Sequence, residues 1–326
     1  MGDYRMRSKD GLHKLLLPLS FGRSSTVLLR ILNAHIEYQR KSFAGQGFEL
    51  HVLVVEPPSI SPSNPPCDRR FDLVQKSFPM HSYSQVPFHS VFEYDPDIHA
   101  IISKFAGANF EDNTSLSHKE RLDAFRASIP TATSRTDVDY ILMSRLVVAC
   151  AKKSGCIGVL WGDSDSRLAA KTLANVAKGR GSSVTWQVSD GMSAWGLMFN
   201  FPLRELFSVE VQQYADLYPE LRDIMMPDAP RSENVLTKNL SIDELMMRYV
   251  QTHGEKYPGV MANVTRTASK LQSPSISPDA PLCSLCGSMA GTSGGSLESD
   301  ALAENSDKCE APQFCYACAR SRPEVA

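Results

Sequence analysis

The chain has 326 residues, of which 42% are hydrophobic and 21% charged, and its formal net charge is −2. This composition is typical of a globular protein with a sizeable core, and no apolar run is long enough to predict a membrane-spanning helix. The near-neutral charge argues against a protein that binds nucleic acid by itself, because phosphate contacts require a basic excess. Eight cysteines without an apolar secretion signal favour metal binding over disulfides, so we expect a cytosolic protein.

Apolar patterns predict alternating strands and helices along most of the chain. Residues 13–20 (HKLLLPLS) and 48–56 (FELHVLVVE) are apolar runs typical of strands that are buried on both faces, and residues 25–42 between them carry a helical apolar stripe. Further strands are predicted at 88–94, 156–162, 182–188 and 196–201, and further helices at 115–129, 136–155 and 166–181. The alternation predicts an α/β fold, with a Rossmann-like, mostly parallel sheet covered by helices on both faces.

The composition changes after residue 271. A last long helix is predicted at 241–259, beginning with a capping box formed by Ser241 and Glu244. Residues 272–281 (QSPSISPDAP) have the composition of a linker, and residues 291–307 that of a low-complexity loop. We therefore predict a Rossmann-like domain over 1–271 and a Cys-rich segment over 272–326.

The turn after the first strand, SFGRSS, is placed where a nucleotide-binding protein carries its phosphate loop. It resembles the SGGxDS loop of the ATP pyrophosphatases that adenylate their substrates. Ser20, Gly22 and Ser25 match that loop, Phe21 replaces a glycine and Ser24 replaces the aspartate. These two changes remove backbone freedom and a carboxylate for Mg²⁺, so they argue against binding of ATP and Mg²⁺. Within the same turn, the Arg23 guanidinium is a candidate phosphate ligand. The alternative is an ordinary strand–helix turn.

A second polar turn follows the strand at 156–162. Because the carboxyl ends of parallel strands share one edge of a sheet, we expect Gly162 and Asp163 to lie beside the first turn. Asp163 is a candidate for binding a ribose or a metal, although an aspartate in a tight turn also bonds its own backbone.

Several stretches together resemble the cytoplasmic tRNA 2-thiolation protein 2 family. They are the turn sequence SFGRSS, the HVLVVE strand, the GDS turn with LAAKTLANVAKGRG, the stretch FPLRELFSVEVQQYADLYP and the pairs CSLC and CYAC. The resemblance implies a degenerate, non-catalytic subunit that pairs with a catalytic homologue in the complex that 2-thiolates the wobble uridine of tRNA(Lys), tRNA(Glu) and tRNA(Gln).

The same resemblance implies that the sulfur comes from a thiocarboxylated ubiquitin-like carrier, which the complex also serves in urmylation of other proteins. Relatives usually carry a Cys-rich segment before the first strand. Here few residues precede that strand, so we expect either that the sequence begins late or that this member lacks the segment.

Two Cys-x2-Cys pairs near the C-terminus, Cys283 with Cys286 and Cys315 with Cys318, suit a tetrahedral structural Zn²⁺. Free thiols in a tail and redox chemistry are the alternatives, and Cys309 is a spare candidate ligand. Earlier in the chain there is no such pair, which argues against independent sulfur chemistry.

Basic residues on the predicted helix at 166–181 are candidates for contact with the tRNA backbone: Lys171, Lys178 and Arg180. Basic residues near a helix C-terminus also complement the helix dipole, so both interpretations stay open. Two rival functions remain as well. One is an active ATP pyrophosphatase-type tRNA-modifying enzyme, and the other is a zinc-dependent RNA-binding module.

Overall fold

The computed structural model describes residues 12–43, 47–57, 67–227, 240–254, 256–271, 281–290 and 313–323. Its strands are β1 (His13–Pro18), β2 (Phe48–Glu56), β3 (Ser82–Pro87), β4 (Gly158–Leu160), β5 (Gly191–Met192) and β6 (Met198–Asn200). Its α-helices are α1 (Arg23–Phe43), α2 (Cys67–Ser77), α3 (Val91–Tyr94), α4 (Ile98–Ala106), α5 (His118–Ser128), α6 (Ala132–Lys153), α7 (Asp165–Ala177), α8 (Val184–Gln187), α9 (Ser208–Asp216), α10 (Ile242–Gly254), α11 (Pro258–Lys270) and α12 (Tyr316–Arg320).

The strands form one six-stranded sheet in the order β3-β2-β1-β4-β6-β5, which is parallel except for the pairing of β5 with β6. The chain runs from β1 outward to β3 and then returns to place β4 on the other side of β1. This reversal makes β1 and β4 the switch point of the sheet, where doubly wound folds bind their ligands. The predicted fold class is thereby confirmed.

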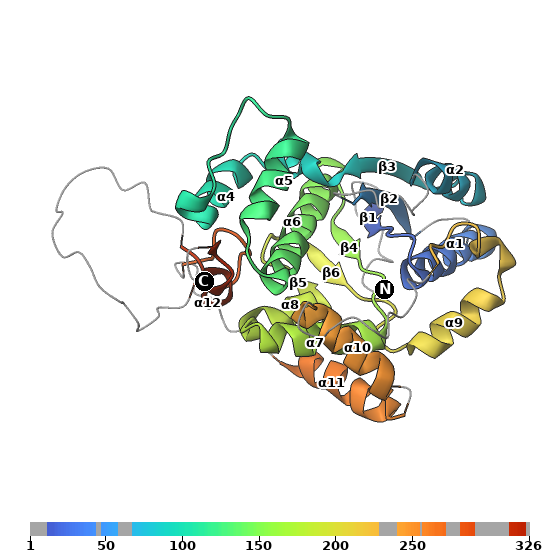
Figure 1. Cartoon of the computed structure of the whole chain (residues 1–326). Helices are drawn as coiled ribbons and strands as arrows, with labels where there is room; N and C mark the ends of the chain where they lie inside the picture. Colours follow the sequence, from blue (N-terminus) through green and yellow to red (C-terminus); the bar gives the residue numbers. More distant parts are fainter. Residues whose placement is uncertain are drawn as a thin grey trace.

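Side chains of β1 alternate between two buried layers. Leu15 and Leu17 belong to the hydrophobic cluster that includes residues of α1, α2 and α9, whereas Leu16 belongs to the cluster with residues of α4, α5 and α6. Figure 1 shows α1 and α9 on one side of the sheet and α5 and α6 on the other. A strand that is buried on both faces has apolar residues at nearly every position. For this reason β1 could be predicted from the sequence.

Two predicted strands are wrong. Residues 88–94 form a 3-10 turn (Phe88–Ser90) and α3, and the strand next to β2 is the preceding polar segment β3. Residues 182–188 lie in a 3-10 turn (Gly181–Ser183) and α8. The single helix predicted at 241–259 is two helices in the structure, α10 and the beginning of α11. The predicted capping box is confirmed. Ser241 N–H donates to Glu244 Oε2 at 2.8 Å, and Glu244 N–H donates to Ser241 Oγ at 3.2 Å.

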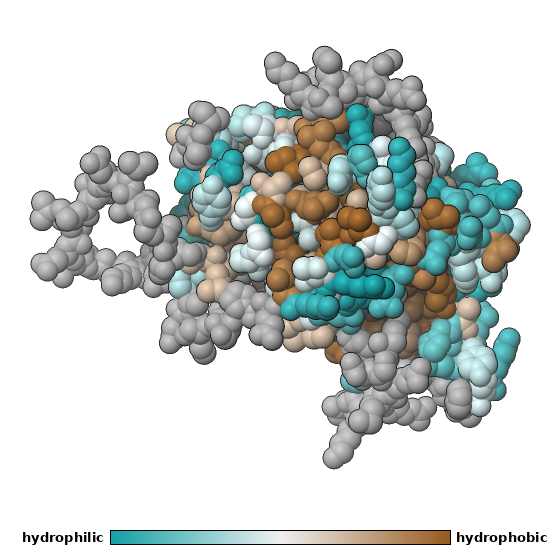
Figure 2. Space-filling model, turned by 90° about the horizontal axis from the view of Figure 1, so that it is seen from below, coloured by the Kyte–Doolittle hydropathy of each residue, from teal (hydrophilic) through white to brown (hydrophobic). Residues whose placement is uncertain are grey.

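Helices α10 and α11 pack on α7 at the bottom of Figure 1. Seen from below, apolar side chains gather in the middle of this face (Figure 2). Tyr249 of α10 and Val260 of α11 are 47% and 54% exposed. In the described part of the chain, none of the helices has the length and apolar character needed to span a bilayer.

Candidate functional site: a closed loop and a cysteine cluster

The polar groups of the SFGRSS turn are bonded to one another. Ser20 Oγ and Ser25 Oγ are 3.1 Å apart, Gly22 N–H donates to Ser20 Oγ at 3.4 Å, and Ser25 Oγ donates to the Gly22 carbonyl at 3.0 Å. Ser24 and Arg23 begin α1 and are half-buried. A loop that binds phosphate directs its backbone N–H groups and hydroxyls at the ligand. Here the two serine hydroxyls and the Gly22 N–H contact partners within the turn.

Phe21 fills the place of the glycine that it replaces. Its φ is +56°, in the left-handed region that glycine adopts readily and that costs other residues about 1–2 kcal/mol. Its side chain is 1% exposed and belongs to the cluster between the sheet and α1, and its carbonyl accepts a 2.8 Å hydrogen bond from Met226 N–H. Burial of a phenylalanine ring contributes more than this strain costs. The residue therefore keeps the backbone turn of the loop while its ring is part of the core.

The two polar turns lie against each other, as the parallel sheet predicts. A Cβ on Gly162 would lie 2.7 Å from Ser25 Cα, a distance that real Cβ atoms do not reach. Gly162 is therefore required at this contact between the turn after β4 and the first turn of α1.

Asp163 is paired inside the protein. It is 6% exposed, and its carboxylate accepts from Lys171 Nζ at 2.5 Å and from Arg167 Nε at 3.2 Å. Burial alone would raise the pKa of Asp163, but the charges of Lys171 and Arg167 outweigh burial and hold the pKa below its usual value. Two candidate residues, one for a nucleotide and one for RNA, thus form an ion pair with each other.

The other two candidate RNA contacts are internal. The side chains of Lys178 and Arg180 are 6% and 1% exposed, and both bind Asp137 of α6, with Lys178 Nζ 3.0 Å and Arg180 Nε 2.8 Å from its carboxylate. Lys178 also contacts Asp243 of α10 at 2.8 Å. Contact of Lys178 and Arg180 with tRNA therefore stays a prediction, and in this structure both side chains are enclosed with Asp137.

The two Cys-x2-Cys pairs come together in one cluster. The sulfur atoms of Cys283, Cys286, Cys315 and Cys318 all lie within 4.8 Å of one another and all four residues are buried. Cys286 Sγ and Cys315 Sγ are 3.6 Å apart, too far for a disulfide, and the four residues are free cysteines. Among the residues that the structure describes, no other group of His, Cys, Asp and Glu has this closeness. Cys309 lies outside the described residues.

Local backbone geometry places the first pair. Cys283 N–H donates to the Ser288 carbonyl at 2.7 Å and Gly287 N–H donates to the Cys283 carbonyl at 2.8 Å, which closes a tight turn around the two sulfurs. Gly287 has a φ of +71°, so this turn requires a glycine. Ser284 N–H donates to the Gln313 carbonyl at 2.9 Å, which joins the turn to the segment that carries the second pair.

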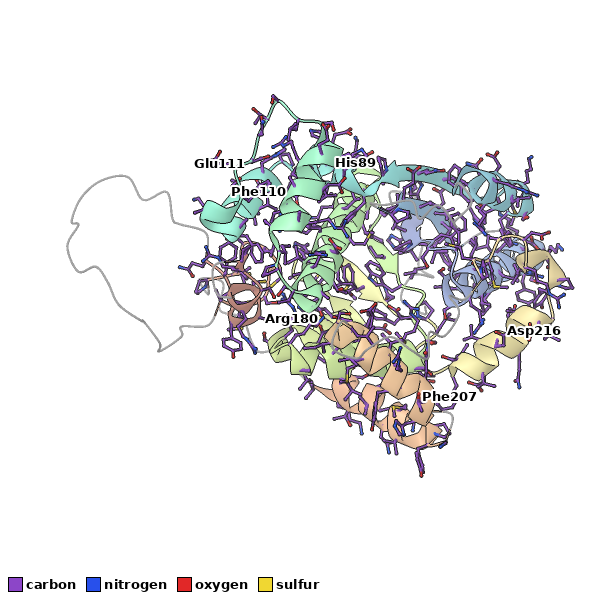
Figure 3. All side chains as sticks on the ribbon, in the orientation of Figure 1. His89, Phe110, Glu111, Arg180, Phe207 and Asp216 are labelled. Carbon is purple, nitrogen blue, oxygen red and sulfur yellow. The ribbon has the colours of Figure 1, made fainter. Side chains whose placement is uncertain are left out.

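Two arginines contact the cysteine segments, the buried Arg180 and the half-buried Arg145. Arg180 Nη2 donates to Cys318 Sγ at 3.4 Å, and Arg145 Nη1 of α6 donates to the carbonyls of Ser284 and Leu285 at 3.0 Å each. Figure 3 shows Arg180 between the core helices and the C-terminal turn with α12. Arg145 and Asp137 belong to no motif of the sequence and were not predicted as site residues. An arginine or aspartate inside an otherwise apolar helical face, such as that of residues 136–155, is the signal that indicates such a buried partner.

The cluster has the geometry of a single metal ion site. A tetrahedral ion with metal–sulfur bonds of about 2.3 Å holds its sulfurs about 3.8 Å apart, close to the separation of Cys286 and Cys315. Four thiolates around a divalent ion carry net negative charge, and the buried guanidinium of Arg180 offsets part of that charge. The four cysteines therefore fit a metal ion such as zinc.

Comparisons with known proteins agree with the sequence resemblance. A family model described as "Cytoplasmic tRNA 2-thiolation protein 2" matches residues 241–311. Proteins of that name from Aspergillus clavatus and Neosartorya fischeri are each 61% identical over 100% of this chain and 88% of their own length. The protein of that name from Emericella nidulans is 54% identical over 99% of both chains.

A solved structure shares the fold. The U34-tRNA thiolase NcsA from Methanococcus maripaludis, solved with its [4Fe-4S] cluster, superimposes with a TM-score of 0.54 over 88% of this chain and 79% of that chain. The two sequences are 13% identical, so this similarity shows the α/β fold alone.

Proposed function

Since the chain belongs to the cytoplasmic tRNA 2-thiolation protein 2 family and has a role in tRNA 2-thiolation, we propose that it acts there as an accessory subunit without catalytic activity of its own. In this proposal it is needed in the cytoplasm for 2-thiolation of the wobble uridine of tRNA(Lys), tRNA(Glu) and tRNA(Gln). The sulfur comes from a thiocarboxylated ubiquitin-like carrier, and the same complex serves urmylation.

The closed SFGRSS turn is the observation that carries the proposal. An adenylating site needs free N–H groups for phosphate and a carboxylate for Mg²⁺. In this chain the Ser20 and Ser25 hydroxyls bond within the turn, Phe21 occupies the glycine position, and Ser24 stands where a carboxylate is needed. The paired Asp163 cannot replace that carboxylate without breaking its contacts to Lys171 and Arg167. ATP and Mg²⁺ are thus expected not to bind here.

The catalytic partner in this proposal is a homologous thiolase subunit, with which the chain forms a heterodimer. The apolar side chains that gather in the middle of the face shown in Figure 2 support assembly with another protein. On the neighbouring helices, Tyr249 of α10 and Val260 of α11 are also exposed. Contact with tRNA then occurs through the complex.

Zinc is the metal that we propose for the four cysteines, in a structural role. Their sulfurs are too close together for a cluster of several irons, which would separate the four thiolates further than one ion does. The burial of Cys283, Cys286, Cys315 and Cys318 also supports a structural site over a free zinc-dependent RNA-binding module, because these residues belong to the same hydrophobic cluster as Leu16 of β1.

The test is mass spectrometry of wobble uridines in tRNA from cells that lack this protein. Complementation with the wild-type chain is expected to restore 2-thiouridine, and so is complementation with a Ser20→Ala/Gly22→Ala/Ser25→Ala variant. Failure of a folded and paired variant would show that the turn still binds a ligand and would favour the active pyrophosphatase. Survival of 2-thiouridine in the deleted cells would refute the proposed function.

A further inference from the structure

Two buried charged residues beside the ends of α7 each have a polar atom without a hydrogen-bond partner among the described residues. Asp165 begins the helix and its Oδ2 atom is unpaired, whereas Arg180 follows the helix and its Nη1 atom is unpaired. The two residues are 4% and 2% exposed. Since buried polar atoms are nearly always hydrogen-bonded, an unpaired one indicates where a further group belongs. The surroundings of each atom decide which group that is.

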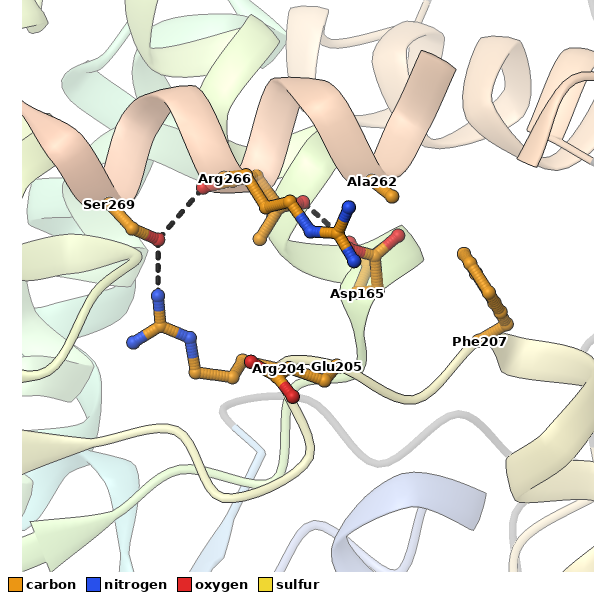
Figure 4. Close-up of a pocket in the computed structure, with 8 residues that line it drawn as sticks. Asp165, Arg204, Glu205, Phe207, Ala262, Arg266 and Ser269 are labelled. Carbon is orange, nitrogen blue, oxygen red and sulfur yellow. Dashed lines mark hydrogen bonds between the residues drawn. The ribbon is translucent and has the colours of Figure 1, made fainter. Parts of the chain in front are cut away.

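The surroundings of Asp165 favour no single class of ligand. A pocket of about 80 Å³ lies beside this residue (Figure 4). Two acidic and two basic side chains contribute to its wall, namely Asp165, Glu205, Arg204 and Arg266. Because both charges share the wall, neither an anion nor a cation is favoured. The pocket has room for water, which can donate the hydrogen bond that Asp165 lacks.

Arg180, in contrast, faces the cysteine cluster. A guanidinium has five N–H donors, of which Nε carries one and each Nη carries two. Nε donates to Asp137 Oδ1 at 2.8 Å, and Nη2 donates both to Asp137 Oδ2 and to Cys318 Sγ, the latter at 3.4 Å. These contacts engage Nε and Nη2 completely. The donors on Nη1 are therefore those that remain for a further acceptor.

The four sulfurs are the group whose charge changes when a metal ion binds. All of them lie within 4.8 Å of one another, so Cys318 is close to the other three. A thiol is a weak hydrogen-bond acceptor. A thiolate that binds a metal ion carries negative charge, and charge-assisted hydrogen bonds are the stronger ones. Metal binding would therefore strengthen the contact between Arg180 and Cys318, and it would offer Nη1 acceptors that thiols supply only weakly.

Asp137 holds the guanidinium in this orientation. Its carboxylate is 2% exposed and accepts from Nε and Nη2 of Arg180 side by side, which is the geometry of a bidentate pair. Lys178 Nζ also lies 3.0 Å from the same carboxylate. Replacement of Arg180 would thus leave Asp137 with a second cation, and no uncompensated buried charge would result.

We propose that Arg180 is a positioning residue of the metal site, which sets how tightly the four cysteines bind a divalent ion. It acts through its hydrogen bond to Cys318 and through its charge, and Asp137 directs it toward the sulfurs. This inference rests on the metal ion that is proposed above for the cysteine cluster.

Titration of the metal-free, full-length chain with Co²⁺ tests the inference, because Co²⁺ bound to thiolates has a sulfur-to-metal charge-transfer band. Competition with Zn²⁺ then gives the affinity for zinc. Arg180→Met is expected to weaken Zn²⁺ binding about 10–100-fold, the usual effect of removing a partner of a metal ligand. The band is expected to move to longer wavelength, because a hydrogen bond stabilises the sulfur electrons. Arg180→Lys keeps the charge without the planar fork, so an intermediate affinity is expected.

Arg145 provides the matched control. It supports the same turn through the carbonyls of Ser284 and Leu285, while its Nε binds Asp95 at 2.6 Å. Arg145→Met is expected to lower the stability of the turn and to leave the charge-transfer band in place. Unchanged affinity in Arg180→Met, or equal band shifts in the two variants, would overturn the inference. If Arg180→Met does not fold, wild-type affinity and band position in Arg180→Lys would overturn it.

The same titration separates this inference from the proposed metal site. If the wild-type chain and Arg180→Met bind Co²⁺ and Zn²⁺ equally well, the inference fails and the metal site stands. If the wild-type chain binds neither ion, the metal site fails and the inference fails with it. Complementation of 2-thiouridine in deleted cells tests the role in thiolation independently, because its readout is tRNA modification and not metal affinity.

Discussion

Substitution of Asp137 tests how much its buried ion pairs contribute to the stability of the fold. It is 2% exposed and compensates two buried cations, Arg180 and Lys178. The substitution Asp137→Asn keeps the shape of the side chain and removes its charge. Removing one partner of a buried ion pair costs about 3–5 kcal/mol, because the remaining charge is left buried without compensation. Asparagine still accepts one hydrogen bond, so we expect a loss of about 3 kcal/mol in the free energy of unfolding.

Urea unfolding of the full chain measures this loss, and the same helix offers the control. Asp139 pairs with Arg126 at 2.9 Å, but the two side chains are 25% and 21% exposed. Since exposed pairs contribute little, Asp139→Asn is expected to cost about 1 kcal/mol or less. Equal losses in the two variants would refute the reasoning that burial of Asp137 makes its charge indispensable. Adding Arg180→Met to Asp137→Asn is expected to recover part of the loss, because it removes one uncompensated cation.

The pH dependence of the stability lost in Asp137→Asn follows from the direction in which the pKa of Asp137 is shifted. Burial alone would raise the pKa of Asp137, but the charges of Arg180 and Lys178 outweigh burial and lower it. A carboxyl with a lowered pKa contributes stability that is fully present above its unfolded pKa of about 3.9 and is lost as pH falls through the folded value. The difference in stability between wild type and Asp137→Asn is therefore expected to be constant near neutral pH and to shrink below about pH 4.

Three further predictions concern the closed turn and the cysteine cluster. Phe21→Gly relieves the left-handed φ but removes a buried ring, so we expect a net loss of about 2 kcal/mol or more in urea unfolding, and a gain would contradict this account. Gly162→Ala forces a Cβ against Ser25 and is expected to cost about 1–3 kcal/mol, whereas Gly181→Ala, whose Cβ meets nothing within 4 Å, is expected to cost much less. Removal of metal with a chelator is expected to lower the melting temperature of the whole domain in one calorimetric transition, and a separate early transition would show that the cysteine segment folds independently.

The sheet could be predicted where both faces of a strand are buried. β1 and β2 are apolar runs, and their order along the chain is enough to place the two polar turns at one edge. β3 was not predicted because its sequence, SYSQVP, is mostly polar, as suits a strand at the edge of the sheet. The segment that was predicted in its place has Phe88, Val91 and Phe92 buried, a spacing that suits a helical turn as well as a short strand.

The candidate site could be predicted only in part, for a physical reason. The four cysteines lie in two short Cys-x2-Cys segments, so they could be predicted as metal ligands from their spacing in the sequence. Which cations remain available to RNA depends on partners that are distant in sequence. Arg180 meets Asp137, 43 positions earlier, and Cys318, 138 positions later. A basic residue near a helix end is compatible with both a surface contact and an internal ion pair. Only the packing of the helices decides between the two.

Helix α7 connects the two parts of the site. Its first residues follow Gly162, at the carboxyl edge with the closed turn, and the chain just after its last residue carries Arg180 to the cysteine cluster. A helix of 13 residues is about 20 Å long, so a metal ion held by the four cysteines would lie too far from the edge to take part in chemistry there. Its effect on that edge is expected through stability, because the cysteines and Leu168 of α7 share one hydrophobic cluster. A metal ion that held the four cysteines together would therefore also stabilise the position of α7, which begins at Asp165.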